Sequence, residues 1–490
     1  MATVLMAGSS VALDQDTDKL ALLQLESLFN DEGGALSSWN DSNHFCSWNG
    51  VTCGLRHRRV ISLYLHSLGL SGSISPYVGN LSFLRSIDLG GNSLGGEIPA
   101  EIGDLPRLQS LNLSSNNLEG QIPSNISRCS ELWRVELDHN HLVGPLPVEM
   151  ESLSKLKILH LSTNKLTGEI PPSFGNLSLL EEFDLLDNDM HGEVPLSLSQ
   201  TRLRIFYISI NNFAGEFPPA LYNLSSLNKI GLHQNNFYGN LRTDIGLLLP
   251  NLQQIVLSSN QFTGQIPASF SNSTSLEQID IDQNNFTGTL PSSFGLLQNL
   301  TWLNIPGNFL GGSSSDDGLG FIEHLSNCTM LQWLDFSINQ YEAELPLSIT
   351  NLTTQLQWLQ MFRNFIYGHI PERIDRLIGL HRLTLEGNLL SGTIPATIGK
   401  LSNLWHLDLG DNKFTGVIPP VIGNITGLGH LYLYNNSLEG SIPSSLGNCK
   451  ILQELRLCHN KLGGQYRSAC LAAVLFWYFS IFLTTPSEVP

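Results

Sequence analysis

The sequence predicts a right-handed solenoid of the α/β class, in which each repeat contributes one strand to a parallel concave sheet. The phrase LxxLxLxxNxLxGxIP, with conservative swaps, recurs seventeen times between Val60 and Tyr466. Most copies begin 24 residues after the previous one, and sixteen of them carry Asn at the same place. One such unit cannot bury its own apolar face, so the copies are expected to stack on one another.

The strand of each repeat is predicted from its apolar positions, and the period lies in the range of leucine-rich repeats. In the copy at residues 108–116, Leu108, Leu111 and Leu113 are expected to point inward. The Asn that follows is expected to be buried, because its amide can bond backbone groups that the turn leaves unpaired. After Leu68 in the first copy, the predicted ladder residues are Asn92, Asn116, Asn140, Asn164, Asn188, Asn211, Asn235, Asn260, Asn284, Asn308, Asn339, Asn364, Asn388, Asn412, Asn436 and Asn460.

The repeats define the expected domain organisation. Residues 1–13 form a weak candidate signal peptide, since a small apolar run lacks a basic segment before it. Residues 14–58 are expected to be an N-terminal cap, and residues 59–466 the seventeen repeats. A hydrophobic tail follows at residues 467–490. A solenoid exposes core Leu at its ends, so a cap is needed there.

Composition and motifs argue against nucleic-acid binding and catalysis. The net charge is -18, whereas phosphate binding needs clustered Lys and Arg. GxSxG at Gly91–Gly95 lies in a solenoid turn rather than between a strand and a helix. Asp280, Asp282 and Asn284 resemble the start of a calcium loop, but the required Gly and Glu do not follow. No enzymatic activity, cofactor or metal is therefore predicted.

Two features predict an extracellular or plasma-membrane-associated protein of the secretory pathway. Cys46 and Cys53 stand seven residues apart before the first repeat, a spacing that suits a small disulfide-closed cap. Glycosylation motifs are frequent, although Asn-rich repeats produce some by accident. The predicted glycosylation sites are Asn40, Asn80, Asn112, Asn125, Asn176, Asn223, Asn272, Asn285, Asn299, Asn327, Asn351, Asn424 and Asn435.

Three segments carry a family resemblance. The region of residues 18–53, with LSSWN from Leu36 and CSWNGVTC from Cys46, resembles the N-terminal cap of plant leucine-rich-repeat receptors. The LxGxIP ending resembles plant-type repeats. The 31-residue step from Asn308 to Asn339 resembles the twelfth subfamily of plant leucine-rich-repeat receptor kinases, which includes immune receptors for bacterial flagellin and elongation factor Tu. The resemblance implies a ligand-sensing ectodomain whose C-terminal repeats meet a receptor-kinase co-receptor.

The chain departs from that family after Gly464, where GQYRSAC replaces the usual ending of the repeat. The kinase motifs are not found in the sequence. Residues 469–483 read ACLAAVLFWYFSIFL, and the uncharged stretch around them is long enough for a marginal membrane helix. No Lys or Arg follows as an anchor. Three interpretations stay open: a membrane span, a truncated or misread 3' end in place of further repeats, and a makeshift apolar cap.

The outward strand positions predict a binding surface. Trp302, Trp333 and Trp358 occupy one column on consecutive strands, where a spacing of roughly 4.8 Å would join them into an aromatic stripe. Exposed Trp, Tyr and Arg dominate binding hot spots. The alternative is that these Trp pack on the neighbouring strand or under the insertion at residues 311–325. The predicted ligand-binding residues are Trp302, Trp333, Trp358, Phe362, Arg382, Trp405, Tyr432 and Tyr434.

The N-terminal half of the same face is acidic. This patch is interpreted as solvated surface, with attraction of a basic peptide as the alternative. Its residues are Glu136, Asp138, Glu181, Glu182, Asp184 and Asp187.

The sequence thus predicts an extracellular recognition module that binds a peptide or protein ligand, in plant immunity or signalling, together with a co-receptor. One alternative is a secreted inhibitor of a cell-wall hydrolase, resembling polygalacturonase-inhibiting proteins. Those proteins are shorter, with about ten repeats and a C-terminal cap, as the resemblance implies. A truncated receptor product without a function of its own is the other alternative.

Overall fold

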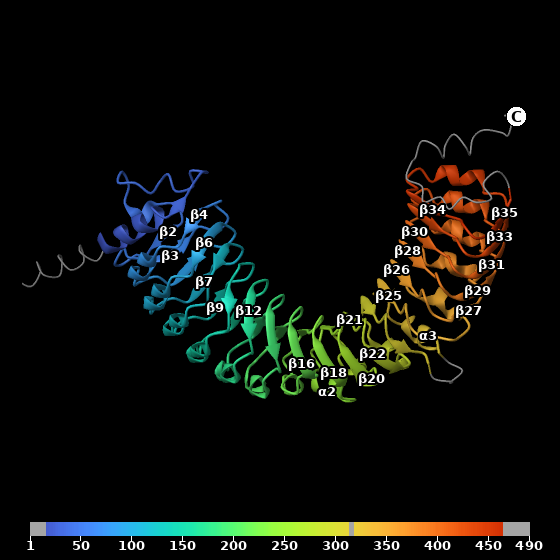
Figure 1. The fold of residues 1–490 in the computed structure, drawn as a ribbon, viewed down its shortest axis with the longest axis horizontal. Coiled ribbons are helices and arrows are strands. Elements are labelled where there is room, and N and C mark those ends of the chain that lie inside the picture. Colours follow the sequence, from blue (N-terminus) through green and yellow to red (C-terminus); the bar gives the residue numbers. More distant parts are fainter. Residues whose placement is uncertain (1–15, 313–317, 464–490) are drawn as a thin grey trace, which may run out of the picture. The chain divides into compact units, whose positions relative to one another are not determined.

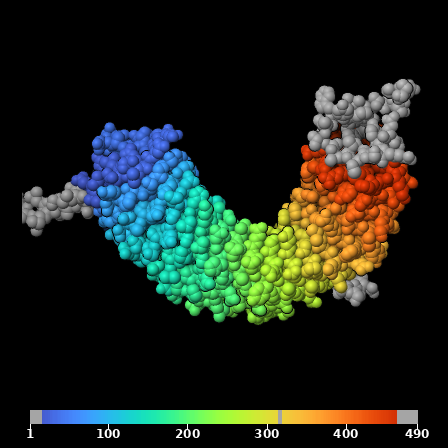
Figure 2. Space-filling view, in the orientation of Figure 1, coloured from blue at the N-terminus to red at the C-terminus, as the bar shows by residue number. Residues whose placement is uncertain are grey.

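The computed structural model describes residues 16–312 and 318–463 of the chain (Figure 1). The predicted signal peptide and the predicted hydrophobic tail lie outside the described residues. The chain divides into two compact units, Met1–Phe237 (unit 1) and Tyr238–Pro490 (unit 2). Each unit is a leucine-rich-repeat solenoid of the α/β class, as predicted, and within each unit successive repeats occupy successive bands of colour (Figure 2).

The N-terminal cap of unit 1 combines a helix over residues 16–26 with short strands. Cys46 and Cys53 form the predicted disulfide, with their Cα atoms 5.4 Å apart. The 3-10 helix η1 (Phe45–Ser47) contains the first of these cysteines, and β2 (Val51–Cys53) ends at the second. Strand β2 pairs antiparallel with β3 (Val60–Tyr64) of the first repeat, so the disulfide closes a loop at the edge of the repeat sheet.

A buried ion pair joins the cap helix to the first repeat. Asp18 is fully buried and Arg59 is 4% exposed. Arg59 Nε donates to Asp18 Oδ2 over 2.9 Å, and Arg59 Nη2 donates to Asp18 Oδ1 over 2.8 Å. The Val60 N–H also donates to Asp18 Oδ2. Because both charges are buried and hydrogen-bonded, loss of either partner would leave an uncompensated charge inside the cap.

The first strand of every repeat in unit 1 joins one parallel sheet, which we call the main sheet. Each short strand buries its central residue and points its flanking residues outward, as the alternation predicts. After β3, the main-sheet strands of unit 1 are β5 (Ser86–Asp88), β7 (Ser110–Asn112), β9 (Arg134–Glu136), β11 (Ile158–His160), β13 (Glu182–Asp184), β15 (Ile205–Tyr207) and β17 (Lys229–Gly231).

A second strand follows the ladder position in these repeats, in addition to the predicted strand of the main sheet. It is formed by the LxG segment and builds what we call the side sheet. Its last Gly adopts positive φ, as Gly168 does at 81°, so the chain can leave the strand. The strands are β4 (Ser71–Ser73), β6 (Ser93–Glu97), β8 (Asn117–Glu119), β10 (Val143–Gly144), β12 (Lys165–Gly168), β14 (Asp189–Gly192) and β16 (Asn212–Glu216). The cap strand β1 (Phe29–Asn30) pairs antiparallel with β4.

Short 3-10 helices complete the repeats of unit 1. The Pro after the side strand precedes most of these helices, where its fixed φ suits the helix start. A Cβ on Gly175 would lie 2.5 Å from the carbonyl oxygen of Ser197, so the helices of neighbouring repeats are in close contact. The helices are η2 (Pro76–Asn80), η3 (Ala100–Asp104), η4 (Ser124–Arg128), η5 (Val148–Ser152), η6 (Pro172–Asn176), η7 (Leu196–Gln200) and η8 (Leu221–Asn223).

Unit 2 is built in the same way. Its main-sheet strands are β19 (Gln254–Val256), β21 (Gln278–Asp280), β23 (Trp302–Asn304), β25 (Trp333–Asp335), β26 (Trp358–Gln360), β28 (Arg382–Thr384), β30 (His406–Asp408), β32 (His430–Tyr432) and β34 (Glu454–Arg456). Its helices are α2 (Ile245–Leu248), η9 (Ala268–Asn272), η10 (Ser292–Leu296), α3 (Phe321–Leu325), η11 (Leu347–Asn351), η12 (Glu372–Arg376), η13 (Ala396–Lys400), η14 (Pro420–Asn424) and η15 (Ser444–Asn448).

The side sheet of unit 2 is interrupted at the 31-residue repeat. Before the interruption its strands are β18 (Asn236–Asn240), β20 (Gln261–Gln265), β22 (Asn285–Gly288) and β24 (Phe309–Leu310). After it they are β27 (Tyr367–Gly368), β29 (Leu389–Gly392), β31 (Lys413–Val417), β33 (Ser437–Gly440) and β35 (Lys461–Leu462). The main sheet continues across the same repeat, because β23 pairs with β25. The extra residues therefore leave from the side of the solenoid.

The ladder Asn side chains are directed inward, as predicted: eleven are at most 9% exposed and the other five are half-buried. Asn116 donates from Nδ2 to the carbonyls of Leu89 and Leu113, and it accepts from the Leu94 N–H over 2.9 Å. Leu89 and Leu94 belong to the preceding repeat. Each ladder residue therefore satisfies its own turn and fastens the repeat to its neighbour.

We predict that Asn116→Ala destabilises unit 1 by about 2 to 4 kcal/mol, because it leaves buried backbone donors and acceptors unpaired. The neighbouring Asn117 has an exposed side chain, so Asn117→Ala is the matched control and should change stability by less than about 0.5 kcal/mol. Urea unfolding followed by circular dichroism measures both. Equal effects of the two substitutions would show that the ladder bonds contribute little.

Candidate ligand-binding surface

The outward positions of the main sheet in unit 2 form two parallel columns. The pairing of β23 with β25, and of β25 with β26, places Trp302, Trp333 and Trp358 directly opposite one another. The first column continues through Arg382, His406, His430 and Glu454. The second column contains Asn304, Asp335, Gln360, Thr384, Asp408, Tyr432 and Arg456.

The three Trp rings stack along the sheet, and we call them the tryptophan ladder. The ring centroids of Trp302 and Trp333 are 4.0 Å apart, with 13° between the planes. Those of Trp333 and Trp358 are 4.6 Å apart, with 26° between the planes. The rings are half-buried rather than largely exposed, because each ring covers the face of the next. Part of each ring stays accessible to a partner, whereas the indole Nε1 atoms of Trp302 and Trp333 are buried, without a hydrogen-bond partner among the described residues.

The tryptophan ladder ends beside polar residues, so the predicted single stripe is divided into two groups. Strand β28 places Arg382 and Thr384 next to β26, and the Arg382 guanidinium lies 5.6 Å from the centre of the Trp358 ring. Arg382 can therefore extend the ladder by a cation–π contact. Among the described residues, no ring contact joins Phe362 to the ladder.

The second group, which we call the histidine–tyrosine cluster, contains Trp405, His406, His430, Tyr432, Glu454 and Arg456. Trp405 is 39% exposed, and its ring centre lies 4.4 Å from that of His430. The Tyr432 hydroxyl donates to Glu454, and the Arg456 guanidinium lies 4.7 Å from the Tyr432 ring. Tyr434 lies apart from these contacts and donates its hydroxyl to Glu386 over 2.8 Å. The cluster presents aromatic and paired charged groups on the same sheet.

Buried titratable groups lie on the strands that carry the tryptophan ladder and the histidine–tyrosine cluster. His406 is 6% exposed, and burial next to Arg382 lowers its pKa to about 4. Asp408 is 8% exposed, and burial raises its pKa to about 7. Burial also raises the pKa of Asp335, which accepts a 3.0 Å hydrogen bond from Gln360. His406 and Asp408 are therefore largely uncharged at mildly acidic pH.

Sequence reasoning missed these groups because it treated outward positions as exposed. On a short strand between two close neighbours, the larger side chains of the adjacent strands cover a small polar side chain that points outward. Asp280, on β21, shows the same effect: burial and the neighbouring Asp282 raise its pKa. In the parts of the chain that the structure describes, no group of three or more His, Cys, Asp or Glu side chains could hold a metal ion.

In the acidic patch of unit 1, Glu136 and Glu181 form ion pairs with Arg134 and Lys157. Glu136 is 8% exposed and accepts from Arg134 Nη2 over 2.6 Å. His160 Nε2 lies 3.2 Å from Glu182 Oε2. Because its own side chains neutralise part of the patch, these contacts favour its interpretation as ordinary structure over a site for a basic peptide. Among the predicted glycosylation sites, ten Asn side chains are exposed, and the half-buried ones are Asn112, Asn125 and Asn285.

We predict that Asp408→Asn stabilises the protein at pH 8 and has little effect near pH 4. The carboxyl binds a proton more tightly in the folded chain, with a pKa of about 7, than in the unfolded chain. Wild-type stability should therefore fall as pH rises from about 4 to above 7. One pKa unit corresponds to about 1.4 kcal/mol, so the gain at pH 8 should be about 2 to 4 kcal/mol.

Urea unfolding at both pH values checks this prediction. Asp189→Asn is the control, because that side chain is exposed on β14. If Asp408→Asn were destabilising at pH 8, or equally stabilising at both pH values, the buried carboxyl would not titrate in this way.

Among the described residues, no helix is long and apolar enough to cross a membrane.

Comparison with known proteins assigns the family. The leucine rich repeat N-terminal domain matches residues 15–54. Leucine rich repeats match residues 249–310 and five further segments, at 83–105, 107–129, 155–177, 403–425 and 427–449. The LRR receptor-like serine/threonine-protein kinase EFR of Arabidopsis thaliana is 68% identical over 374 residues, which cover 76% of this chain and 36% of EFR. The chain thus spans about a third of the length of that receptor.

Two solved structures have the same architecture. The plant peptide hormone receptor RGFR1, in complex with RGF2, has a TM-score of 0.69 and 30% identity, covering 86% of this chain and 80% of RGFR1. The Arabidopsis receptor kinase HAESA, in complex with the peptide hormone IDA and the co-receptor SERK1, has a TM-score of 0.65 and 25% identity. The match covers 91% of this chain and 94% of the HAESA chain. Together with the cap and the repeats described above, these matches show that the chain belongs to the plant leucine-rich-repeat receptor kinases and corresponds to their ectodomain.

Proposed function

We propose that the chain is the extracellular recognition module of a plant receptor, and that the main sheet of unit 2 binds a peptide or protein ligand. The tryptophan ladder carries the proposal. It offers adjoining aromatic edges on a rigid sheet, and Trp is enriched at the centres of binding hot spots. A module of this kind acts by binding and carries out no reaction of its own.

The lining of this surface favours a ligand that is partly apolar. Arg382 and the histidine–tyrosine cluster supply hydrogen-bonding and cationic groups beside the ladder. The raised pKa values of the buried Asp335 and Asp408 favour their neutral forms, which repel an acidic segment less than ionised carboxylates would. An extended peptide could therefore place apolar side chains on the ladder and polar groups further along the sheet.

A co-receptor and an immune or signalling role are parts of the same proposal. The HAESA structure contains a peptide hormone and the co-receptor SERK1 together. The exposed sequon Asn side chains and the disulfide of the cap support passage through the secretory pathway. The C-terminal repeats are the part proposed to meet the co-receptor.

We predict that Trp333→Ala weakens ligand binding by about 2 kcal/mol or more, which is about a thirtyfold rise in Kd. Removing the central ring should disrupt both stacking contacts of the ladder. The probe is a set of dodecapeptides selected on the wild-type chain from a phage-displayed library, with Kd measured by calorimetry. Circular dichroism and urea unfolding establish that the variant is folded.

The control is Phe365→Ala, because Phe365 is 51% exposed and lies away from the main-sheet columns. It should leave Kd within twofold of the wild-type value. Unchanged binding by folded Trp333→Ala would place the ligand elsewhere on the solenoid. If Trp333→Ala alone fails to fold, the ring has a structural role. In that case Arg382→Ala tests the same surface, and an unchanged Kd for that variant would overturn the proposal.

A further inference from the structure

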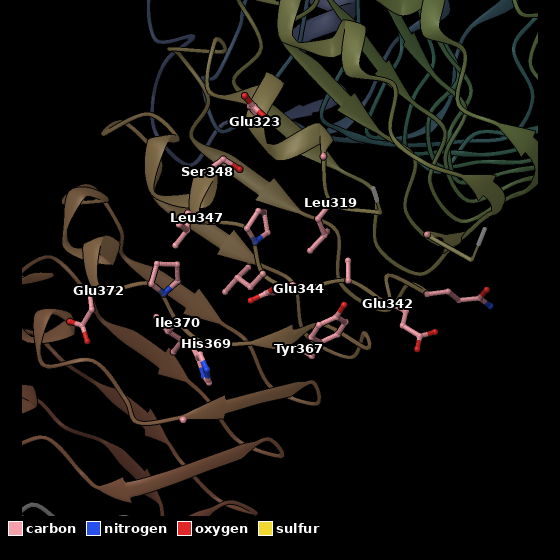
Figure 3. A pocket seen from close by; sticks show the side chains of 18 of the residues that line it. Leu319, Glu323, Glu342, Glu344, Leu347, Ser348, Tyr367, His369, Ile370 and Glu372 are labelled. Carbon is pink, nitrogen blue, oxygen red and sulfur yellow. The ribbon is translucent and has the colours of Figure 1, made fainter. Parts of the chain in front are cut away.

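One region of unit 1 has a charge opposite in sign to that of the whole chain. The net charge is -18, and the groove beside the 31-residue repeat of unit 2 follows this sign, since it is lined by the exposed carboxylates of Glu323, Glu342, Glu344 and Glu372 (Figure 3). The basic region lies next to the N-terminal cap, and we call it the cap arginine patch. It consists of the exposed side chains of Arg56, Arg58, Arg85 and Arg107.

Two of these arginines lie in the loop between β2 and β3. The Gly54 N–H donates to the Arg59 carbonyl, and the Arg58 N–H donates to the Gly54 carbonyl, both over 2.9 Å. The loop begins directly after Cys53 of the disulfide, and it ends at Arg59, whose side chain forms the buried ion pair of the cap. Because both ends of the loop are fixed, its backbone positions Arg56 and Arg58.

Phe83 connects this loop to the repeats that carry the other two arginines. The guanidinium carbons of Arg59 and Arg107 lie 4.6 and 4.0 Å from the centre of the Phe83 ring. Such cation–π contacts favour guanidinium groups beside the ring although their charges repel one another. Arg85 follows Phe83 by two residues, and its N–H donates to the Ile61 carbonyl of β3 over 2.8 Å. The patch is therefore assembled from the loop and the two repeats beside it.

The arginines of the patch form no ion pair with any described residue. Nearby bases do form them: Arg128 Nη1 lies 3.7 Å from Asp104 Oδ1, and Lys155 Nζ lies 2.6 Å from Glu131 Oε1. The guanidinium groups of the patch thus keep donors for a partner. A guanidinium can bind a carboxylate through two parallel hydrogen bonds, so carboxylates are the groups that the patch fits best.

The same loop also presents an apolar side chain. Leu55 is fully exposed, at 101%, and directly precedes Arg56. A protein segment can place an apolar residue on Leu55 and carboxylates on the arginines, whereas an acidic polysaccharide has no apolar side chain to place there. A long polyanion or an anionic membrane would also meet the acidic patch on the main sheet of the same unit. These features favour a short acidic segment of a protein.

We propose that the cap arginine patch binds a short acidic segment of a partner protein, with its carboxylates on the arginines and one apolar side chain against Leu55. The site lies in unit 1, so it is separate from the main-sheet surface of unit 2 that the proposed ligand occupies. It gives the N-terminal cap a role in partner binding, in addition to covering the first repeat.

The test uses the whole chain and a fluorescein-labelled octapeptide of glutamates with one central leucine, with fluorescence anisotropy at about 0.15 M salt. We expect saturable binding, and no binding of the peptide in which glutamine replaces every glutamate. The double substitution Arg56→Glu with Arg58→Glu should raise Kd at least tenfold. The matched control is Arg202→Glu with Arg204→Glu, an exposed pair of the same spacing in unit 1, which should change Kd less than twofold.

Two further variants test the parts of the patch separately. Leu55→Ser should raise Kd at least threefold for the peptide with leucine, and less than twofold for a peptide with serine in its place. Arg85→Glu lies outside the loop and should also weaken binding, so it tests the patch if the double variant fails to fold. Circular dichroism establishes that each variant is folded.

Equal losses in the two double variants would show general attraction between a polyanion and scattered cations, and would overturn the proposal. Tighter binding of a uronic-acid oligosaccharide or of phosphatidylserine vesicles than of the peptide would overturn the assignment of a protein partner. Trp333→Ala should leave binding of the acidic peptide unchanged, so failure here is distinguishable from failure of the proposed ligand site.

Discussion

The structure depends on one turn, in which a ladder Asn compensates for an unfavourable backbone conformation beside it. The residue before the ladder Asn has positive φ in the repeats of both units, even where it is Thr163 or Ile338, at 51° and 50°. β-branched residues rarely adopt this conformation, because the left-handed region costs about 1 to 2 kcal/mol. The hydrogen bonds of the Asn hold the turn and fasten it to the preceding repeat. Regular stacking follows from repeating this turn, and it allows the main sheet to run unbroken through the 31-residue repeat.

Regular stacking also explains how surface sites arise in this fold. Residues at one repeat position lie one above another at the strand spacing of roughly 4.8 Å, which is close to the stacking distance of aromatic rings. Three Trp at one position therefore become a stacked ladder with centroids 4.0 and 4.6 Å apart. An irregular repeat instead interrupts the alignment of side-sheet residues from one repeat to the next. The 31-residue repeat interrupts the side sheet between β24 and β27, while the main sheet continues through it.

The sequence predicts what the repeat determines and little of what depends on departures from it. The ladder Asn, the buried strand Leu and the register of the Trp column all follow from position in the repeat. The second strand was not predicted, because a three-residue LxG segment has no alternation to detect. The Asp18–Arg59 pair joins residues 41 positions apart and leaves no local pattern. The burial of Asp335 and Asp408 depends on the size of side chains on adjacent strands, which one repeat alone does not show.

Hydrogen exchange at single residues in the native protein tests the central role of the ladder most directly. The N–H groups of Leu94 and Phe262 donate to the side chains of Asn116 and Asn284. The account predicts that they exchange as slowly as the main-sheet amides of their own unit, because they open only when the repeats separate. Exchange of Leu94 and Phe262 at the rate of exposed loop amides would contradict the account.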